Sequence, residues 1–132
     1  MPRVLLVEDD AAVRQAIERA LVRFGCRVTP AAAARDALAA IQDAAFDVVL
    51  TDVHMPEHDG LWLWRAATAR RPELRGRFIF MSGSSTRQAI AERAPGERFL
   101  AKPFDLVRLD AEIRAVAQSV RRASCEGSED SA

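Results

Sequence analysis

Acidic side chains follow two short apolar runs of the chain, and its only lysine follows a third. Glu8 and Asp9 come directly after VLLV, Asp52 comes after VVLT, and Lys102 comes after FLA. If these runs are neighbouring parallel strands, their carboxyl ends meet at one edge of a sheet, where open α/β folds place their ligand sites. We therefore expect an acidic pocket that contains one cationic side chain.

The residue types in this pocket indicate a chemistry. Three carboxylates that lie close together repel one another, and they stay ionised together only when a cation neutralises them. Oxygen ligands without a suitable set of histidines or thiols favour a hard divalent ion such as Mg²⁺. A carboxylate beside Mg²⁺ and a lysine is well placed to attack a phosphoryl group and to hold it as an acyl phosphate.

The surrounding pattern predicts the elements that position these residues. Short β-type runs alternate with helical patterns, which is typical of an α/β fold with a parallel sheet between two layers of helices. The first helix follows Asp10, because apolar residues recur at helical spacing from Val13 to Phe24. Pro30 opens the second helix, and Leu106 begins an inward-facing apolar stripe on the last one. The predicted elements are, in chain order, a strand at 4–7, a helix after Asp10, a strand at 26–29, a helix from Pro30, a strand at 48–50, a helix at 61–71, a strand at 78–81, a helix from about Thr86, a strand near 99–101 and a helix at 105–122.

Length and composition exclude several classes of protein. A chain of 132 residues fits one domain. Lysine plus arginine equal aspartate plus glutamate at 19 each, so we expect no direct binding to nucleic acid and no attraction to an anionic membrane. The apolar runs are far shorter than the ~20 residues that cross a bilayer, and the first residues show no signal-peptide pattern. We expect a soluble, cytoplasmic protein whose cysteines, Cys26 and Cys125, stay reduced and unpaired.

Several landmarks occur together in the order and approximate spacing of response-regulator receiver domains, the CheY-like domains of two-component signalling. These landmarks are Glu8-Asp9, Asp52 followed by Met55-Pro56 and Asp59-Gly60, Ser82-Gly83, and Lys102-Pro103-Phe104. The resemblance implies a flavodoxin-like, three-layer, doubly wound (βα)5 fold with a five-stranded parallel sheet in the order 2-1-3-4-5. Residues 1–122 would form the receiver domain, and residues 123–132, which have almost nothing to bury, a disordered C-terminal tail.

The resemblance assigns roles to the acidic residues. Asp52 matches the phosphoacceptor, whose carboxylate attacks the phosphorus of a phosphohistidine. Asp9 matches a direct ligand of Mg²⁺ and Glu8 a ligand that acts through water, while Asp52 and the backbone carbonyl of His54 complete the protein ligands. Asp10 falls at the opening of the first helix, where an aspartate has the simpler task of capping free N–H groups.

The resemblance also assigns roles around the phosphoryl group. Lys102 matches the lysine that pairs with a phosphoryl oxygen, and Pro103 matches a position whose preceding peptide bond is cis. Ser82 matches a switch hydroxyl that bonds the phosphoryl oxygen. Phe99 falls where the family carries an aromatic switch residue, often tyrosine. Because this chain contains no tyrosine, any switch at Phe99 depends on packing alone.

The implied function is a phosphorylatable receiver that accepts a phosphoryl group on Asp52 in a Mg²⁺-dependent reaction. Its expected partners are a sensor histidine kinase or a histidine phosphotransfer protein, and a downstream protein target. It would catalyse only its own phosphorylation and dephosphorylation, so it would not be a turnover enzyme. A single-domain regulator, a phosphorelay shuttle and an excised receiver of a hybrid kinase all fit, and a homodimer stays open.

Three other functions were weighed on the same residues. A flavin carrier needs a hydroxyl-rich and glycine-rich loop after the first strand to cradle phosphate, and the acidic residues there would repel it. A Mg²⁺-dependent hydrolase with an aspartyl nucleophile would carry a second acid two residues later, where this chain has His54. A pseudo-receiver that only docks proteins is the remaining alternative, although none of the essential residues is missing.

Two tryptophans lie close to the predicted pocket. On a helix that opens after Gly60, Trp64 would pack against the sheet, whereas Trp62 would point about 200° away and be more exposed. An exposed tryptophan beside a site is a candidate docking residue, and half-buried packing is the simpler interpretation.

Overall fold

The computed structural model describes the backbone of residues 1–130 and the side chains of residues 1–123. Its five strands form one parallel sheet in the order β2-β1-β3-β4-β5, which confirms the predicted fold and strand order. The elements are β1 (Arg3–Val7), α1 (Ala11–Arg23), β2 (Arg27–Ala31), α2 (Ala34–Asp43), β3 (Val48–Asp52), α3 (Gly60–Arg70), a 3-10 turn η1 (Pro72–Leu74), β4 (Phe78–Gly83), a 3-10 turn η2 (Ser84–Thr86), α4 (Arg87–Arg93), β5 (Arg98–Lys102) and α5 (Leu106–Asp130).

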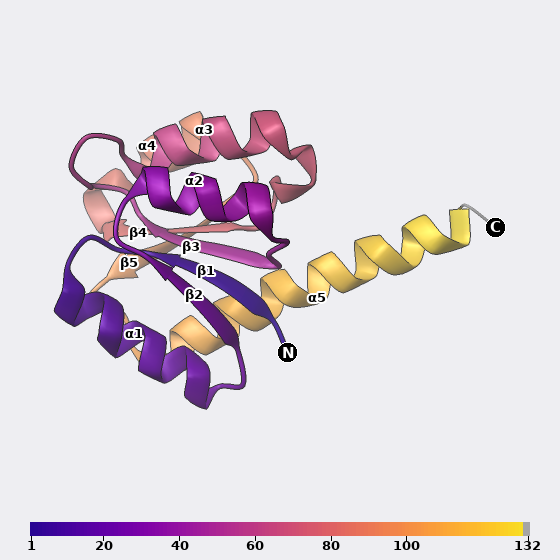
Figure 1. Cartoon of the computed structure of the whole chain (residues 1–132), viewed down its shortest axis with the longest axis horizontal. Coiled ribbons are helices and arrows are strands. Elements are labelled where there is room, and N and C mark those ends of the chain that lie inside the picture. The colour runs from indigo at the N-terminus through magenta and orange to yellow at the C-terminus, as the bar shows by residue number, and fades with distance from the viewer. Residues whose placement is uncertain (131–132) are drawn as a thin grey trace.

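The sheet separates two apolar cores, as Figure 1 shows, with α2, α3 and α4 on one face and α1 and α5 on the other. Successive residues of β1 belong to different cores: Leu5 and Val7 pack under α2 and α3, whereas Val4 and Leu6 pack against α1 and α5. This alternation follows from the two-residue period of a strand. A strand that is buried on both faces reads as a continuous apolar run, which is why β1 and β3 were easy to predict.

Aspartate side chains begin three of the helices at the carboxyl edge of the sheet. The Oδ1 atom of Asp10 accepts hydrogen bonds from the backbone N–H groups of Ala12 and Val13, so this residue caps α1 as predicted. Asp59 accepts from the N–H of Trp62, and Asp105 from that of Arg108. Each cap satisfies N–H groups that the helix itself cannot, which fixes where the helices begin relative to the strand ends.

Pro30 lies inside β2, paired with Leu6, and does not open α2 as the sequence suggested. A proline fits there because β2 is an edge strand. The carbonyl of Ala31 accepts a hydrogen bond from the N–H of Glu8, so Ala31 faces the sheet. The backbone nitrogen of its neighbour Pro30 therefore faces the free edge, where no ladder hydrogen bond is required.

Two apolar residues that were predicted to face the core are exposed. Leu106 is 51% exposed and Val13 is 36% exposed. Both line an open groove between α1 and the start of α5, together with Phe104. Leu106 is the first residue of α5. The turn that leads into the helix decides where its side chain points, so it does not share the orientation of the apolar residues further along α5.

The last helix is longer than predicted, because its backbone continues to Asp130, past the expected boundary at 122. Figure 1 shows that the final turns of α5 extend beyond the sheet. The sequence from 123 to 130 contains no proline, so nothing in it forces the helix to stop. Residues 131–132 of the predicted tail lie outside the described part. Within that part, no helix combines the length and the apolar character that a bilayer crossing requires.

The two tryptophans are both half-buried, which agrees with the simpler interpretation that Trp62 is partly packed. The Nε1 of Trp64 donates a 3.1 Å hydrogen bond to the carboxylate of Glu97, which also accepts from the backbone N–H groups of Gly76 and Phe78. Trp62 is covered by the imidazole of His58, which stacks on it at 3.9 Å between ring centroids. The loop before α3 supplies this cover, and periodicity within the helix could not reveal it.

Candidate functional site

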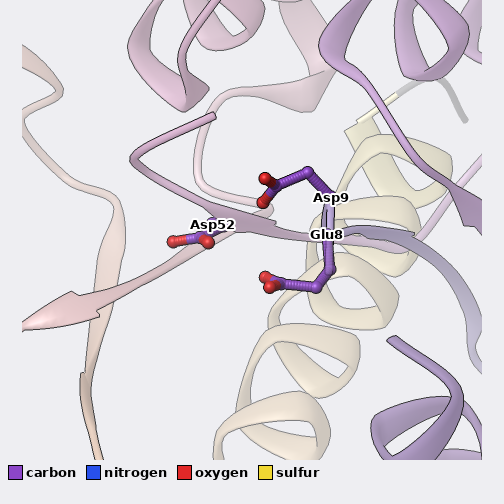
Figure 2. Close-up of side chains that lie close together, drawn as sticks. All are labelled: Glu8, Asp9 and Asp52. Carbon is purple, nitrogen blue, oxygen red and sulfur yellow. The ribbon is translucent and has the colours of Figure 1, made fainter. Parts of the chain in front are cut away.

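The three predicted carboxylates meet at the carboxyl edge of the sheet. β1 and β3 are adjacent and parallel, so the acids that follow Val7 and that end β3 project from the same edge. Figure 2 shows the carboxylates of Glu8 and Asp9 turned toward that of Asp52. One oxygen from each residue can be chosen so that all three lie within 4.8 Å of one another.

Lys102 reaches the same pocket from β5, although β4 lies between β5 and β3. Its Nζ is 3.4 Å from Oδ2 of Asp52 and 3.6 Å from Oε2 of Glu8. The peptide bond between Lys102 and Pro103 is cis. The lysine side chain is one-third exposed, so its ammonium group can contact both the buried acids and solvent.

Glu8 is the most unusual of these acids, because its residue is only 2% exposed. Its Oε2 atom is buried without a hydrogen-bond partner within the described part of the chain, and Lys102 at 3.6 Å offsets its charge only in part. Burial, and then the neighbouring Asp52, raises the pKa of Glu8 from 4.5 to about 7. A buried carboxylate oxygen without a partner is costly. A hard cation held directly by Asp9 and Asp52, and by Glu8 through water, would remove this cost, so the residues fit Mg²⁺.

The raised pKa predicts that the stability of the metal-free protein depends on pH. Because folded Glu8 binds its proton more tightly than unfolded Glu8, the free energy of unfolding should fall as pH rises from about 4.5 to 7. The shift corresponds to a loss of roughly 3 kcal/mol. Denaturant titrations in EDTA at pH 5 and pH 8 measure this loss, and saturating Mg²⁺ should reduce it.

Glu8→Gln is the control for this pH dependence. Glutamine cannot titrate, so the variant should lose most of the difference between pH 5 and pH 8. A variant that retains the full difference would assign the effect to other groups.

Gly60 holds the backbone of Asp52 in place. Its N–H donates a 2.8 Å hydrogen bond to the carbonyl of Val53, which brings the start of α3 against the end of β3. A Cβ atom at Gly60 would lie 2.5 Å from the carbonyl oxygen of Asp52 and 3.2 Å from Cα of Val53. Both are backbone atoms, which cannot rotate away as a flexible side chain could.

We expect Gly60→Ala to displace Asp52 and to destabilise the fold by about 1–3 kcal/mol. Denaturant titration measures the loss of stability, and the Mg²⁺ affinity reports the displaced carboxylate. Gly83→Ala is the matched control, because a Cβ there meets only Oγ of Ser85 at 4.0 Å. Equal losses in the two variants would contradict a specific role for Gly60.

The remaining predicted residues lie around this pocket. Ser82 is buried on β4, one residue after Met81, which is the partner of Asp52 in the sheet register. Phe99 is half-buried on β5, and the guanidinium of Arg87 lies 4.7 Å from its ring centroid. His54 is exposed in the loop after β3, and its carbonyl as a metal ligand stays a prediction.

Two residues near the site were missed or undervalued by sequence reasoning. Arg14 donates a 2.8 Å hydrogen bond from Nη1 to the carbonyl oxygen of Glu8. No sequence motif signals this contact, because it joins the end of β1 to the start of α1 across a turn. Gly60 was noted only as part of a loop signal, and its close approach to Asp52 depends on how α3 packs.

Comparisons with known proteins agree with this fold. The family model described as the response regulator receiver domain matches residues 4–114. The chain is 35% identical over 113 residues to the response regulator receiver protein CpdR of Brucella abortus (strain 2308), covering 86% of this chain and 94% of CpdR. It is 38% identical over 120 residues to the sensor kinase CckA of the same strain, covering 87% of this chain and 12% of the kinase. The structure of the Vibrio cholerae chemotaxis protein CheY4 is similar, with a TM-score of 0.80 and 29% identity over 88% of this chain and 98% of CheY4.

The matched region includes the acidic residues and Lys102, and its fold has the strand order that the resemblance implied. The relatives include a protein of almost the same length and one segment of a much longer kinase. The chain belongs to the response regulator receiver domains of two-component signal transduction.

Proposed function

We propose that this receiver accepts a phosphoryl group on Asp52 in a Mg²⁺-dependent reaction. The donor is a phosphohistidine on a sensor histidine kinase or on a histidine phosphotransfer protein. The observation that carries the proposal is the setting of Asp52: the residue is 8% exposed, and its carboxylate lies against Glu8 and Asp9 with the Lys102 ammonium 3.4 Å away.

The transfer exchanges one bond to phosphorus for another. A carboxylate oxygen of Asp52 attacks the phosphorus, the P–N bond breaks, and the imidazole nitrogen of the donor keeps the electron pair and takes up a proton. Lys102 offsets the negative charge of the transferring phosphoryl oxygens. Bound Mg²⁺ would neutralise the remaining charge, held directly by Asp9 and Asp52, through water by Glu8, and by the carbonyl of His54.

Phosphorylation would change partner binding through Ser82 and Phe99. The Ser82 hydroxyl would bond a phosphoryl oxygen and draw its loop toward the pocket, and Phe99 would repack in response. Arg87 begins α4 directly after the loop that follows Ser82, and its guanidinium lies over the Phe99 ring. A shift of that loop would therefore also move the guanidinium. A downstream protein would detect the altered surface.

The protein would act as a cytoplasmic switch and not as a turnover enzyme, without direct binding to nucleic acid and with a homodimer as one of its states. The alternative is a pseudo-receiver that docks proteins without phosphorylation. The buried Oε2 of Glu8, which has no hydrogen-bond partner among the described residues, favours the phosphorylated switch, because a pure docking module gains nothing from that cost.

Incubation with acetyl phosphate tests the proposal. With Mg²⁺, intact-mass measurement should detect the addition of one phosphoryl group, and hydroxylamine should remove it because an acyl phosphate is reactive. With EDTA in place of Mg²⁺ the addition should be lost. A protein that binds Mg²⁺ but gains no phosphoryl group from acetyl phosphate or from a phosphorylated histidine kinase would support the pseudo-receiver.

A further inference from the structure

The peptide that joins Glu8 to Asp9 carries two of the three acids of the site and lies just beyond the end of β1. In a regular strand consecutive side chains point to opposite faces of the sheet. In Figure 2 the side chains of Glu8 and Asp9 leave the backbone in different directions, and both carboxylates turn toward Asp52. β1 ends at Val7, so this peptide lies outside the strand ladder and requires other contacts to hold its orientation.

Two hydrogen bonds hold the backbone of Glu8. Its N–H donates to the carbonyl of Ala31 at 3.1 Å, which ties it to the end of β2. Its carbonyl, which belongs to the peptide shared with Asp9, accepts from Nη1 of Arg14 at 2.8 Å. Arg14 lies at the end of the first turn of α1, and Asp10 fixes the start of that helix by its cap. The guanidinium therefore links the peptide between the two acids to a rigid element.

We propose that Arg14 is a positioning residue of the metal site: its hydrogen bond holds the Glu8–Asp9 peptide so that both carboxylates face Asp52. This inference rests on the proposed Mg²⁺ site. Arg14 is half-buried, and its acceptor is a neutral carbonyl, so the contact orients the backbone and does not neutralise an acid. Groups that orient metal ligands in this way contribute about 10–100-fold to metal affinity.

The sign of the effect separates positioning from simple electrostatics. Arg14 is a cation near a cation site, so removal of its charge alone should strengthen Mg²⁺ binding. Loss of the hydrogen bond should weaken binding, because the peptide can then rotate and carry Asp9 away from Asp52. Weaker binding after the arginine is removed can therefore not arise from its charge.

Mg²⁺ titration by calorimetry tests the proposal on Arg14→Met, which keeps an apolar stem and loses both donors and charge. We expect its Mg²⁺ dissociation constant to rise about tenfold. Arg19→Met removes the same charge from an exposed position of the same helix and should stay within about twofold of the native protein. Arg14→Lys keeps the charge but replaces the guanidinium with an ammonium group on a shorter side chain, so we expect an intermediate affinity.

Further measurements exclude a general loss of structure. The melting temperatures in EDTA should be similar for Arg14→Met and Arg19→Met, and saturating Mg²⁺ should restore the acetyl phosphate reaction of Arg14→Met. Native or tighter Mg²⁺ binding by Arg14→Met overturns the proposal. If Arg14→Met does not fold, Arg14→Lys decides, and native affinity in that variant overturns the proposal.

The titration of the native protein distinguishes this inference from the proposed function. A native protein that binds Mg²⁺ but takes up no phosphoryl group contradicts only the phosphoacceptor role of Asp52. A native protein that does not bind Mg²⁺ overturns both.

Discussion

Asp52→Asn is expected to abolish acyl phosphate formation completely. The amide of asparagine is a poor nucleophile, and it also removes one negative oxygen from the cation site. Intact-mass measurement after incubation with acetyl phosphate and Mg²⁺ should detect no phosphoryl group on the variant. The fold should persist, because asparagine has nearly the same shape and its substitution relieves the repulsion between Asp52 and Glu8.

Asp10→Asn is the matched control for this experiment. Asp10 lies next to the acidic pair but caps α1, and asparagine is an equally good capping residue. The control should therefore fold and take up the phosphoryl group at close to the native rate. Label that survives Asp52→Asn, or label that disappears in Asp10→Asn, would refute Asp52 as the acceptor.

Lys102→Gln should slow phosphoryl transfer by about a hundredfold or more. The ammonium lies 3.4 Å from Asp52, where it can offset charge that develops on the phosphoryl oxygens, and glutamine cannot supply that charge. Mg²⁺ binding should persist or become tighter, because a competing cation has been removed from the acidic residues. The rate of label uptake from acetyl phosphate and a separate Mg²⁺ titration measure the two effects.

Arg98→Gln provides the comparison for Lys102→Gln. Arg98 is the first residue of the same strand and lies at the end of β5 that is far from the pocket. It pairs with Glu112 on the surface at 2.8 Å. Its loss should leave the rate of phosphoryl transfer nearly native. If the two variants react equally fast, Lys102 has no specific role in the transfer.

The sheet and the acidic pocket could be predicted because the signals were local and redundant. β1 and β3 are buried on both faces, so they appear in the sequence as apolar runs that end in acids. Parallel pairing then brings the ends of both runs to one edge without any detailed geometry. Asp10 was assigned correctly as a cap because a helix start has its own residue preference.

The features that escaped prediction depend on contacts between distant segments. Sequence placed Glu8 beside Asp9 but could not reveal that one of its oxygens is buried without a hydrogen-bond partner in the described part of the chain. The contact between Gly60 and Asp52 depends on the position of α3, and the bond from Arg14 depends on the turn between β1 and α1. Pro30 was misplaced because its helix-opening preference was considered without the edge position of β2.

The position of Pro30 has a consequence for how other proteins can bind. An exposed sheet edge is a template for strand addition, by which an extended peptide or another copy of the chain lengthens the sheet and aggregation begins. Pro30 offers no N–H to an incoming strand, and its ring occupies the path of approach next to the last residue of β2. This edge is thereby protected from amyloid-type assembly, so partners should not engage the receiver by pairing a strand with β2.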